Sequence, residues 1–382
     1  GGTGSCSNGV EKDFNKKFIS HCNNDPKSIY LVDLDGDGLN DVLTAYYTDN
    51  KITWYQNKGL VKDLYNKDSL PAFKAYDIIS NTLGVSDLFP IDIDGDNDID
   101  VLSASSLDNK IAWHKNDGNN NFTEQIISSN AMGAKSVYAV DLDGDGDIDV
   151  VSASYDDDRI AWYINDGLEN FTTMDISSNA DGASDVFLFD VDGDSDLDVL
   201  CTSSIDDKVA WYEQTPSNTF TEHIISSNAD SAQAISAGDI DGDGDIDIVS
   251  ASFNDDKISW YENDGSQNFT EQIIATNRDG ASDVKINDYN ADGELDIIAS
   301  SYLDGTIQIF KNYGGGDFTG IPLLYTENGN PEAIHCGDLD KDGDIDIIYA
   351  SFIADTICNN HSCLGAETSY LFQTCWPKDI YS

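Results

Sequence analysis

A nine-residue acidic motif constrains this sequence more than any other feature. It reads Asp-x-Asp/Asn-x-Asp, closes with Asp at position 9, and occurs in seven copies. The copies begin at Asp33, Asp92, Asp141, Asp190, Asp239, Asp288 and Asp338. Successive starts lie 49 or 50 residues apart, except for a first spacing of 59. A repeat of this length indicates that the chain is built from copies of one unit, each burying its apolar face against its neighbours.

Each unit has room for four strands. In the third copy, the strand-length runs are 136–140 and 150–154 on either side of the motif, followed by 159–163 and 171–176. They are rich in Val, Ile, Tyr, Trp and Thr and are separated by Asp, Asn and Gly turns, which predicts a four-stranded antiparallel meander with strands A to D. Such units are typical of propeller blades. We therefore expect an all-β fold, a seven-bladed β-propeller that forms a single domain over residues 1–382.

The two ends of the chain indicate how the ring closes. Residues 14–20 match the fourth-strand pattern but precede the first A strand, and the regular C strand is missing after residues 346–352. We expect 14–20 to complete the last blade beside a strand near 369–373, because closure removes two exposed sheet edges. Residues 353–382 are then a Cys-containing closing segment. The longer first spacing places an insertion at about residues 58–70, in the first C–D loop.

The acidic motif has the pattern of a calcium loop. Oxygen-bearing side chains occupy positions 1, 3, 5 and 9, and the carbonyl of position 7 is a further candidate, an arrangement that wraps a hard cation. Gly at position 6 in five copies permits a positive φ. The alternative is a solvated acidic turn. Seven in-register copies favour calcium, because crowded carboxylates repel one another without a counter-ion. We expect up to seven calcium ions, bound more weakly at site four, which carries Ser195, and at site six, which carries Asn290.

The candidate ligands occupy positions 1, 3, 5, 7 and 9 of each motif. In loops 33–41, 92–100, 141–149 and 190–198 they are Asp33, Asp35, Asp37, Leu39, Asp41, Asp92, Asp94, Asp96, Asp98, Asp100, Asp141, Asp143, Asp145, Asp147, Asp149, Asp190, Asp192, Asp194, Asp196 and Asp198. In loops 239–247, 288–296 and 338–346 they are Asp239, Asp241, Asp243, Asp245, Asp247, Asp288, Asn290, Asp292, Glu294, Asp296, Asp338, Asp340, Asp342, Asp344 and Asp346.

With these motifs, residues 14–352 resemble the FG-GAP and VCBS repeat family, whose seven-bladed propellers include the head domain of integrin α subunits. The resemblance implies calcium at Asp33, Asp35, Asp37 and Asp41 and at the equivalent positions of the other six motifs. The Phe-Gly and Gly-Ala-Pro signatures of integrin blades are absent, so the resemblance does not extend to integrin-type ligand binding. Members of the family include adhesion proteins, lectin-like propellers and accessory domains of polysaccharide-acting enzymes, and the fold alone does not choose among them.

Composition excludes some partners. The chain has 71 Asp and Glu against 20 Lys and Arg, a formal charge of −51, which is incompatible with gripping nucleic acid through its phosphates. No apolar run approaches the roughly 18 to 20 residues of a membrane helix. Residues 1–9 do not form a signal peptide. We expect a soluble, already processed or trimmed chain without direct membrane insertion.

Cysteines and sequons indicate an extracellular protein, secreted or on the cell surface. Five cysteines near the termini are candidates for disulfides that staple the closure: Cys6, Cys22, Cys358, Cys363 and Cys375. Cys358 could pair with Cys363, and Cys6 or Cys22 with Cys375, which leaves one for another chain. Cys201 and Cys336 are predicted to be buried free thiols. Candidate glycosylation sites are Asn121, Asn170, Asn268 and Asn360. The alternative for these sites is simple repetition of a turn Asn.

No catalytic constellation is evident in the sequence. The histidines occupy unrelated repeat positions, and no nucleophile elbow, phosphate loop or zinc spacing is present. A Trp recurs at one C-strand position, which indicates packing between blades or, alternatively, a sugar-binding platform. These residues are Trp54, Trp113, Trp162, Trp211 and Trp260.

We therefore expect a non-catalytic adhesion, recognition or structural assembly module. Its partner would be an extracellular protein or glycan, a second copy of the chain, or a larger extracellular structure. The variable D–A loops and the B–C loops of the face opposite the calcium loops are where a partner would bind. A calcium-dependent lectin is the alternative, and a polysaccharide-acting enzyme or its accessory domain is the less favoured one.

Overall fold

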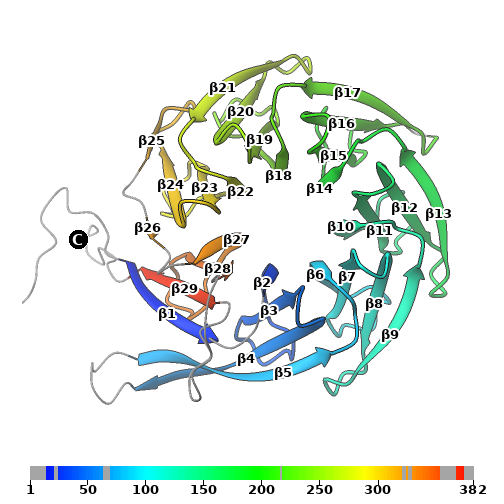
Figure 1. Ribbon diagram of the computed structural model, residues 1–382, viewed down its shortest axis with the longest axis vertical. Coiled ribbons are helices and arrows are strands. Elements are labelled where there is room, and N and C mark those ends of the chain that lie inside the picture. The colour runs from blue at the N-terminus through cyan, green and yellow to red at the C-terminus, as the bar shows by residue number, and fades with distance from the viewer. Residues whose placement is uncertain are drawn as a thin grey trace, which may run out of the picture.

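The chain folds into a ring of β-sheets around a central opening, shown in a computed structural model (Figure 1). The structure describes residues 14–20, 25–62, 69–215, 217–320, 324–325, 329–352 and 367–373. All regular elements in these ranges are strands. None of the described segments is a helix long and apolar enough to cross a membrane. Five of the sheets are antiparallel meanders of four strands that are consecutive in the sequence.

The first three sheets have four strands each. Blade one contains β2 (Pro26–Val32), β3 (Asp41–Tyr46), β4 (Lys51–Lys62) and β5 (Ser69–Ile79). Blade two contains β6 (Val85–Ile91), β7 (Asp100–Ser105), β8 (Lys110–Asn116) and β9 (Phe122–Ser128). Blade three contains β10 (Ala134–Val140), β11 (Asp149–Ser154), β12 (Arg159–Asn165) and β13 (Phe171–Ser177).

The next three sheets continue the pattern. Blade four contains β14 (Ala183–Phe189), β15 (Asp198–Ser203), β16 (Lys208–Gln214) and β17 (Phe220–Ser226). Blade five contains β18 (Ala232–Gly238), β19 (Asp247–Ser252), β20 (Lys257–Asn263) and β21 (Phe269–Ala275). Blade six contains β22 (Ala281–Asn287), β23 (Asp296–Ser301), β24 (Thr306–Asn312), β25 (Phe318–Gly320) and β26 (Leu324–Tyr325).

The closing blade joins both ends of the chain. It contains β27 (Asn330–Gly337), β28 (Asp346–Phe352), β29 (Glu367–Gln373) and β1 (Phe14–Ser20), and β1 pairs antiparallel with β29. Figure 1 shows β1, in blue, beside β29, in red. The N-terminal strand therefore lies where the sequence analysis places it.

An all-β propeller of four-stranded antiparallel blades is confirmed, but the expectation of seven uniform blades is wrong at one of them. Six sheets have four strands, whereas blade six has five, because both the short β25 and the two-residue β26 pair with β24. Its outer strand is divided where the other blades have one continuous D strand. A glycine run, Gly314 to Gly316, with positive φ at all three residues, precedes β25.

The core lies between neighbouring blades. All residues of each B strand from β3 to β23 are buried. The repeated Trp residues are at most 5% exposed, and Trp162 of blade three packs against Val186 and Val199 of blade four. The prediction that these tryptophans fill the space between blades is confirmed, and none presents an open ring face to a sugar.

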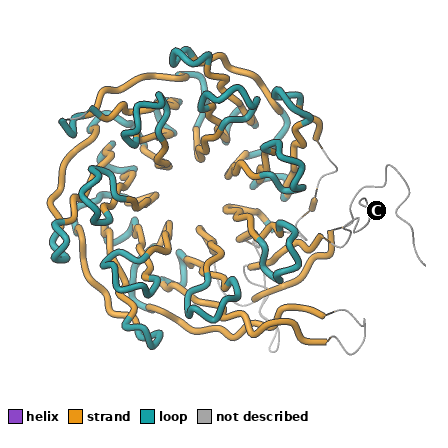
Figure 2. Tube along the Cα trace, turned by 180° about the vertical axis from the view of Figure 1, so that it is seen from behind, coloured by secondary structure: helices purple, strands orange, loops and turns teal. Residues whose placement is uncertain are grey.

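The predicted insertion lengthens one hairpin. β4 and β5 have 12 and 11 residues, and the added pairs run from Leu60 opposite Pro71 to Lys62 opposite Ser69. Figure 2 shows this hairpin extending outward from the ring. Cys201 and Cys336 are free thiols, as predicted, although Cys336 is only half-buried. The predicted disulfide residues Cys6, Cys22, Cys358, Cys363 and Cys375 and the sequon Asn360 lie outside the described residues.

Candidate metal loops and the central channel

Each acidic motif forms the loop between strands A and B of its blade. The loops all close in the same way: the amide of position 6 donates to the carboxylate of position 1. The donors are Gly38, Asn97, Gly146, Ser195, Gly244, Gly293 and Gly343, at 2.8 to 3.1 Å. Every one has a positive φ, including Ser195 at 80°. Ser195, the weakest fit to the motif, therefore leaves the backbone of loop four unchanged.

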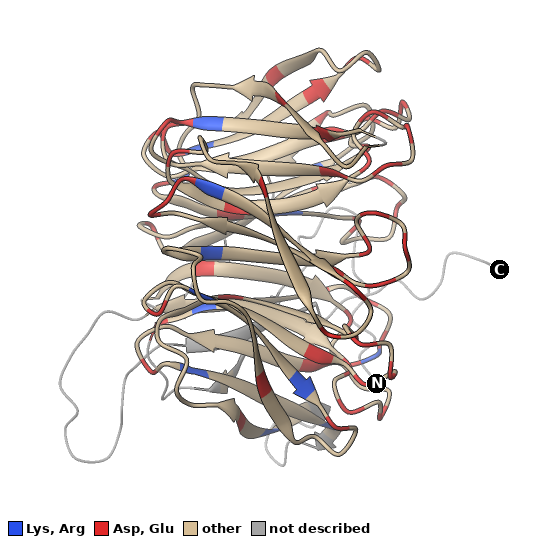
Figure 3. Cartoon of the chain, turned by 90° about the vertical axis from the view of Figure 1, so that its right-hand side faces the viewer, with Lys and Arg blue, Asp and Glu red and all other residues tan. Residues whose placement is uncertain are grey.

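The carboxylates at positions 1, 3 and 5 converge. In loops one to five, one oxygen from each of the three lies within 4.8 Å of the other two. Asp33 Oδ1 and Asp94 Oδ1 are buried and, within the described part of the chain, accept no hydrogen bond. A buried carboxylate oxygen without a donor is costly unless a cation binds it. The donor set is thus one that fits a hard divalent cation. Figure 3 shows that Asp and Glu gather in the loops at both faces of the ring.

The aspartate at position 9 has a different environment. It is the first residue of strand B and is at most 1% exposed in every blade. In blade three, Asp149 Oδ1 accepts the amide of Asn165 at 2.7 Å, and Oδ2 accepts the amide of Leu142 at 3.3 Å. The carboxylate therefore links position 2 of the loop, through Oδ2, to the end of strand C, through Oδ1. The same two kinds of bond recur at Asp41, Asp100, Asp198 and Asp247.

Burial also changes the titration of these position-9 aspartates. It raises the pKa of Asp149 to about 6 and that of Asp346 to about 8, although backbone hydrogen bonds act in the opposite direction. The remaining acids of the loop add repulsion. A cation in the loop would favour the charged form, so binding and ionisation support each other.

In blades one to six, strand C brings one more residue to the loop, 23 residues after position 1. These residues are Gln56, Lys115, Ile164, Glu213, Glu262 and Lys311 in loops one to six. In loop two, Lys115 Nζ lies 2.5 Å from Asp94 Oδ2. In loop six, Lys311 Nζ lies 2.8 Å from Asp292 Oδ2. In loop one, the Gln56 amide donates to Asp35.

Loops four and five receive a further acid at this position. Burial raises the pKa of Asp192, and neighbouring charges, including that of Glu213, raise it further. The same holds for Asp241, with Glu262 nearby. The loops thus have the same backbone conformation but differ in the charge of the residues around them.

The C–D turns lie against the metal loops. A side chain at Gly118, Gly167 or Gly265 would collide with the position-7 aspartate of the same blade. The exposed sequon residues Asn121 and Asn170 stand in these turns, and each side-chain amide donates to an aspartate four residues earlier, at 3.0 Å. Asn268 does the same. This bond gives each Asn a role in its turn, whether or not it carries a glycan.

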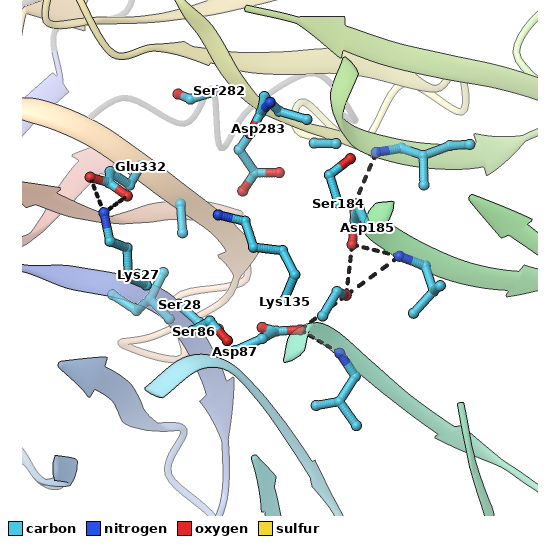
Figure 4. Close-up of a pocket in the computed structure, with 18 of the residues that line it drawn as sticks. Lys27, Ser28, Ser86, Asp87, Lys135, Ser184, Asp185, Ser282, Asp283 and Glu332 are labelled. Atoms are coloured by element: carbon cyan, nitrogen blue, oxygen red, sulfur yellow. Dashed lines mark hydrogen bonds and ion pairs between the residues drawn. The ribbon is translucent and has the colours of Figure 1, made fainter. Parts of the chain in front are cut away.

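The A strands line a central cavity of about 980 Å³. Figure 4 shows Lys27 and Glu332 paired on one side of this cavity, with Lys135, Asp87 and Asp185 also at its wall. Lys27 Nζ lies 2.5 Å from Glu332 Oε2. Deeper aromatic side chains contact one another in sequence around the wall, with ring centroids 4.5 to 5.8 Å apart. They are His335, Tyr30, Phe89, Tyr138 and Phe187.

Three channel aspartates join adjacent blades. Asp87 accepts the amide of Val137 at 3.0 Å, and Asp185 accepts that of Ile235 at 3.1 Å. Asp283 likewise accepts the amide of Ile334 at 2.8 Å. Each bond crosses from an even-numbered blade to the next one. The Ser before each aspartate also donates to a backbone carbonyl of that next blade: Ser86 to Ala134, Ser184 to Ala232 and Ser282 to Pro331.

Asp185→Asn is expected to flatten the pH dependence of stability. Burial raises the pKa of Asp185 to about 7, against an ordinary value of 3.8. Folding therefore favours the protonated form, so this stabilisation is complete below pH 3.8 and is lost as the pH rises through 7. The free energy of unfolding, measured by urea titration of calcium-free protein across this window, should fall less in the variant, by roughly 1–2 kcal/mol. Asp230→Asn, at an exposed loop position, is the charge-matched control. Equal slopes for all three proteins would contradict the assignment.

The histidines show no catalytic arrangement among the described residues. His114 is fully buried, its Nε2 lies 2.9 Å from Ser103 Oγ, and burial lowers its pKa to about 4. Burial likewise lowers the pKa of His335, beside Tyr30, to about 4. His223 stacks on Trp211 and bonds Glu213 at the outer surface. Each of these rings has a packing or hydrogen-bonding partner that accounts for its position.

Comparison with known proteins identifies the repeat. A family model described as FG-GAP-like repeat matches residues 92–152, 141–201, 190–250, 239–299 and 288–349. These matches span more than half of the chain. The chain belongs to the FG-GAP-like repeat family. Each FG-GAP match begins at position 1 of one metal loop and extends to strand B of the next blade. No curated protein matches the sequence.

Solved structures share the propeller fold. One is BBS1N in complex with ARL6DN, soaked with mercury, with a TM-score of 0.61 and 10% identity over 95% of this chain and 97% of that chain. A second, soaked with lead, has a TM-score of 0.61 and 11% identity over 94% and 96%. At this identity the likeness shows the fold alone.

Proposed function

We propose that this chain is a calcium-stabilised, non-catalytic recognition module that binds a protein partner in the extracellular space. The loop geometry supports calcium, because three carboxylates converge in each of five loops and oxygen donors are those that calcium takes. Calcium would rigidify the loops, while the position-9 aspartates hold them to strand C. Loops of extracellular modules bind calcium in the millimolar range, which agrees with the proposed location.

The face around the channel mouth is the proposed binding surface. The B–C turns of blades two, four and six carry Leu107, Ile205 and Leu303 on this face, with exposed fractions of 60%, 52% and 55%, and Leu107 also lines the cavity. Aromatic residues of the intervening blades, including Tyr155 and Phe253, line the mouth of the cavity. Exposed apolar groups gathered around a concave opening are typical of a docking site. This apolar ring is the observation that carries the proposal.

The chemistry of the surroundings defines the partner. The lysines of the B–C turns are already paired: Lys110 with Asp108 and Glu124, and Lys208 with Asp206 and Glu222. These lysines therefore add no unpaired positive charge to the face, and the chain as a whole carries a formal charge of −51. A partner with an apolar patch flanked by basic side chains is complementary to it. The complex of BBS1N with ARL6DN shows that a related propeller fold binds another protein.

A matched pair of triple variants tests this surface. The affinity for the partner should fall at least tenfold in the triple variant Leu107→Asp, Ile205→Asp and Leu303→Asp, because each aspartate would place a charge in an apolar contact. The control is Ile126→Asp, Ile224→Asp and Ile273→Asp, at equally exposed positions of the outer strands. Proteins captured from the native extracellular extract in millimolar calcium are quantified by mass spectrometry. The wild type and the control should retain a shared partner that the mouth variant loses. Identical capture by all three would contradict the proposal.

A further inference from the structure

The seven loops share one backbone conformation, but strand C places residues of different charge beside loops one to six. We propose that Lys115 and Lys311 act as built-in counter-ions that compete with a bound cation in loops two and six, whereas Glu213 and Glu262 make loops four and five the strongest sites. This inference rests on the proposed calcium binding. It ranks the calcium affinities of loops one to six by the side chain at one position of strand C.

In loop six, side chains of the protein itself already bond the candidate metal ligands. Lys311 Nζ lies 2.8 Å from Asp292 Oδ2, at position 5 of the motif. The side-chain amide of Asn290, at position 3, donates to Asp296 Oδ2 at 2.8 Å. Two of the candidate ligand positions are thus engaged by donors of the protein itself. A divalent ion would have to displace the ammonium group or share a carboxylate with it, and both cost binding free energy.

Loop two also has a lysine paired with a candidate ligand, and this lysine bonds a second acidic side chain. Lys115 Nζ lies 2.5 Å from Asp94 Oδ2 and 2.6 Å from Glu169 Oε1, which belongs to the C–D turn of blade three. The Asp94 side chain is only 10% exposed, so its ion pair is weakly screened. The lysine therefore neutralises the loop and also ties blade two to blade three.

In the ranges that the structure describes, no lysine or arginine pairs with the acids of loops four and five, and His223 bonds Glu213 itself at 2.8 Å. Glu213 and Glu262 occupy the strand-C register from which Lys115 reaches Asp94 and Lys311 reaches Asp292, so they bring negative charge to the same side of loops four and five. Calcium affinity rises with the number of charged groups around the site. Ser195 does not offset this in loop four, because its amide donates to Asp190 as glycine does elsewhere. The order expected from the structure thus places loop four among the strongest sites, where the motif alone predicts a weak one.

Calcium titration of the full chain, stripped of metal with a chelator, tests the assignment. Lys311→Met and Lys115→Met keep much of the apolar stem but remove the charge. Each should gain on the order of tenfold in affinity at one weak site, seen by calorimetry and by equilibrium dialysis. The control is Lys257→Met, which removes the same charge from an ion pair with Asp255 and Glu271 in a B–C turn. Its titration should match that of the wild type.

The reciprocal change uses loop three, where the register residue is Ile164. Ile164→Lys should weaken one site by a similar factor, and melting in chelator checks that the variant folds. If the wild type binds calcium, but Lys311→Met, Lys115→Met and Ile164→Lys bind it with the same affinities and stoichiometry, the lysine assignment alone is overturned. Absence of calcium from the wild type and from every variant would overturn the proposed calcium role itself.

Discussion

Asp149→Ala is expected to lower the free energy of unfolding by roughly 3–5 kcal/mol, even with all calcium removed. The Asp149 carboxylate is 1% exposed and accepts the amides of Asn165 and Leu142. Its removal leaves two backbone donors without an acceptor inside the blade. The loss is therefore structural and does not depend on an ion.

Asp145→Ala, at position 5 of the same loop, separates the two roles. Asp145 is exposed, and its carboxylate accepts only the nearby amide of Asp147 among the described residues. In chelator its replacement should cost less than about 1 kcal/mol, whereas in calcium it should remove the stabilisation from one ion. Denaturant unfolding of both variants measures this difference. Asp149→Asn, which keeps one acceptor oxygen, should fall between them. Equal midpoints for Asp149→Ala and Asp145→Ala in chelator would show that position 9 is not a buried clamp.

The repeat made most of the fold predictable. Period, strand composition and turn residues indicated antiparallel four-stranded blades, and the unmatched pattern at 14–20 indicated where β1 pairs. Each of these features is either local in the sequence or repeated, so the structure predicted for one copy applies to the others. The division of the outer strand of blade six into β25 and β26 was not foreseen, because that copy departs from the repeat.

The sequence did not predict that position 9 of each motif has a structural role different from that of positions 1, 3 and 5. Spacing shows which residues carry oxygen but not which way each side chain points. Position 9 starts strand B, and the pleat of that strand then directs Asp149 into the blade and away from Asp145. The signal was present, since two apolar residues follow each position-9 aspartate directly.

The channel residues were missed for a related reason. The Ser-Asp pairs at 86–87, 184–185 and 282–283 recur every 98 residues, which is twice the blade period. A comparison of one repeat with the next therefore does not reveal them as a pattern. Their alternation follows the alternating inter-blade bonds of Asp87, Asp185 and Asp283. The lysines beside loops two and six also required the structure, because strand C, and not the motif, supplies them.

Calcium removal should destabilise the whole ring. Each ion that binds only the folded chain adds about 2.7 kcal/mol when calcium is a hundred times its dissociation constant. Several such sites would raise the melting temperature by on the order of 10 °C or more for a chain of this size. The effect should be specific, because the loops offer flexible oxygen ligands that suit calcium better than magnesium.

The most direct test of the account is the melting temperature of the wild-type chain, recorded by calorimetry in millimolar calcium, in calcium chelator, and in chelator with magnesium. The account predicts a fall on the order of 10 °C in chelator that magnesium does not reverse and added calcium does. An unchanged melting temperature in all three conditions would contradict the claim that calcium stabilises this propeller.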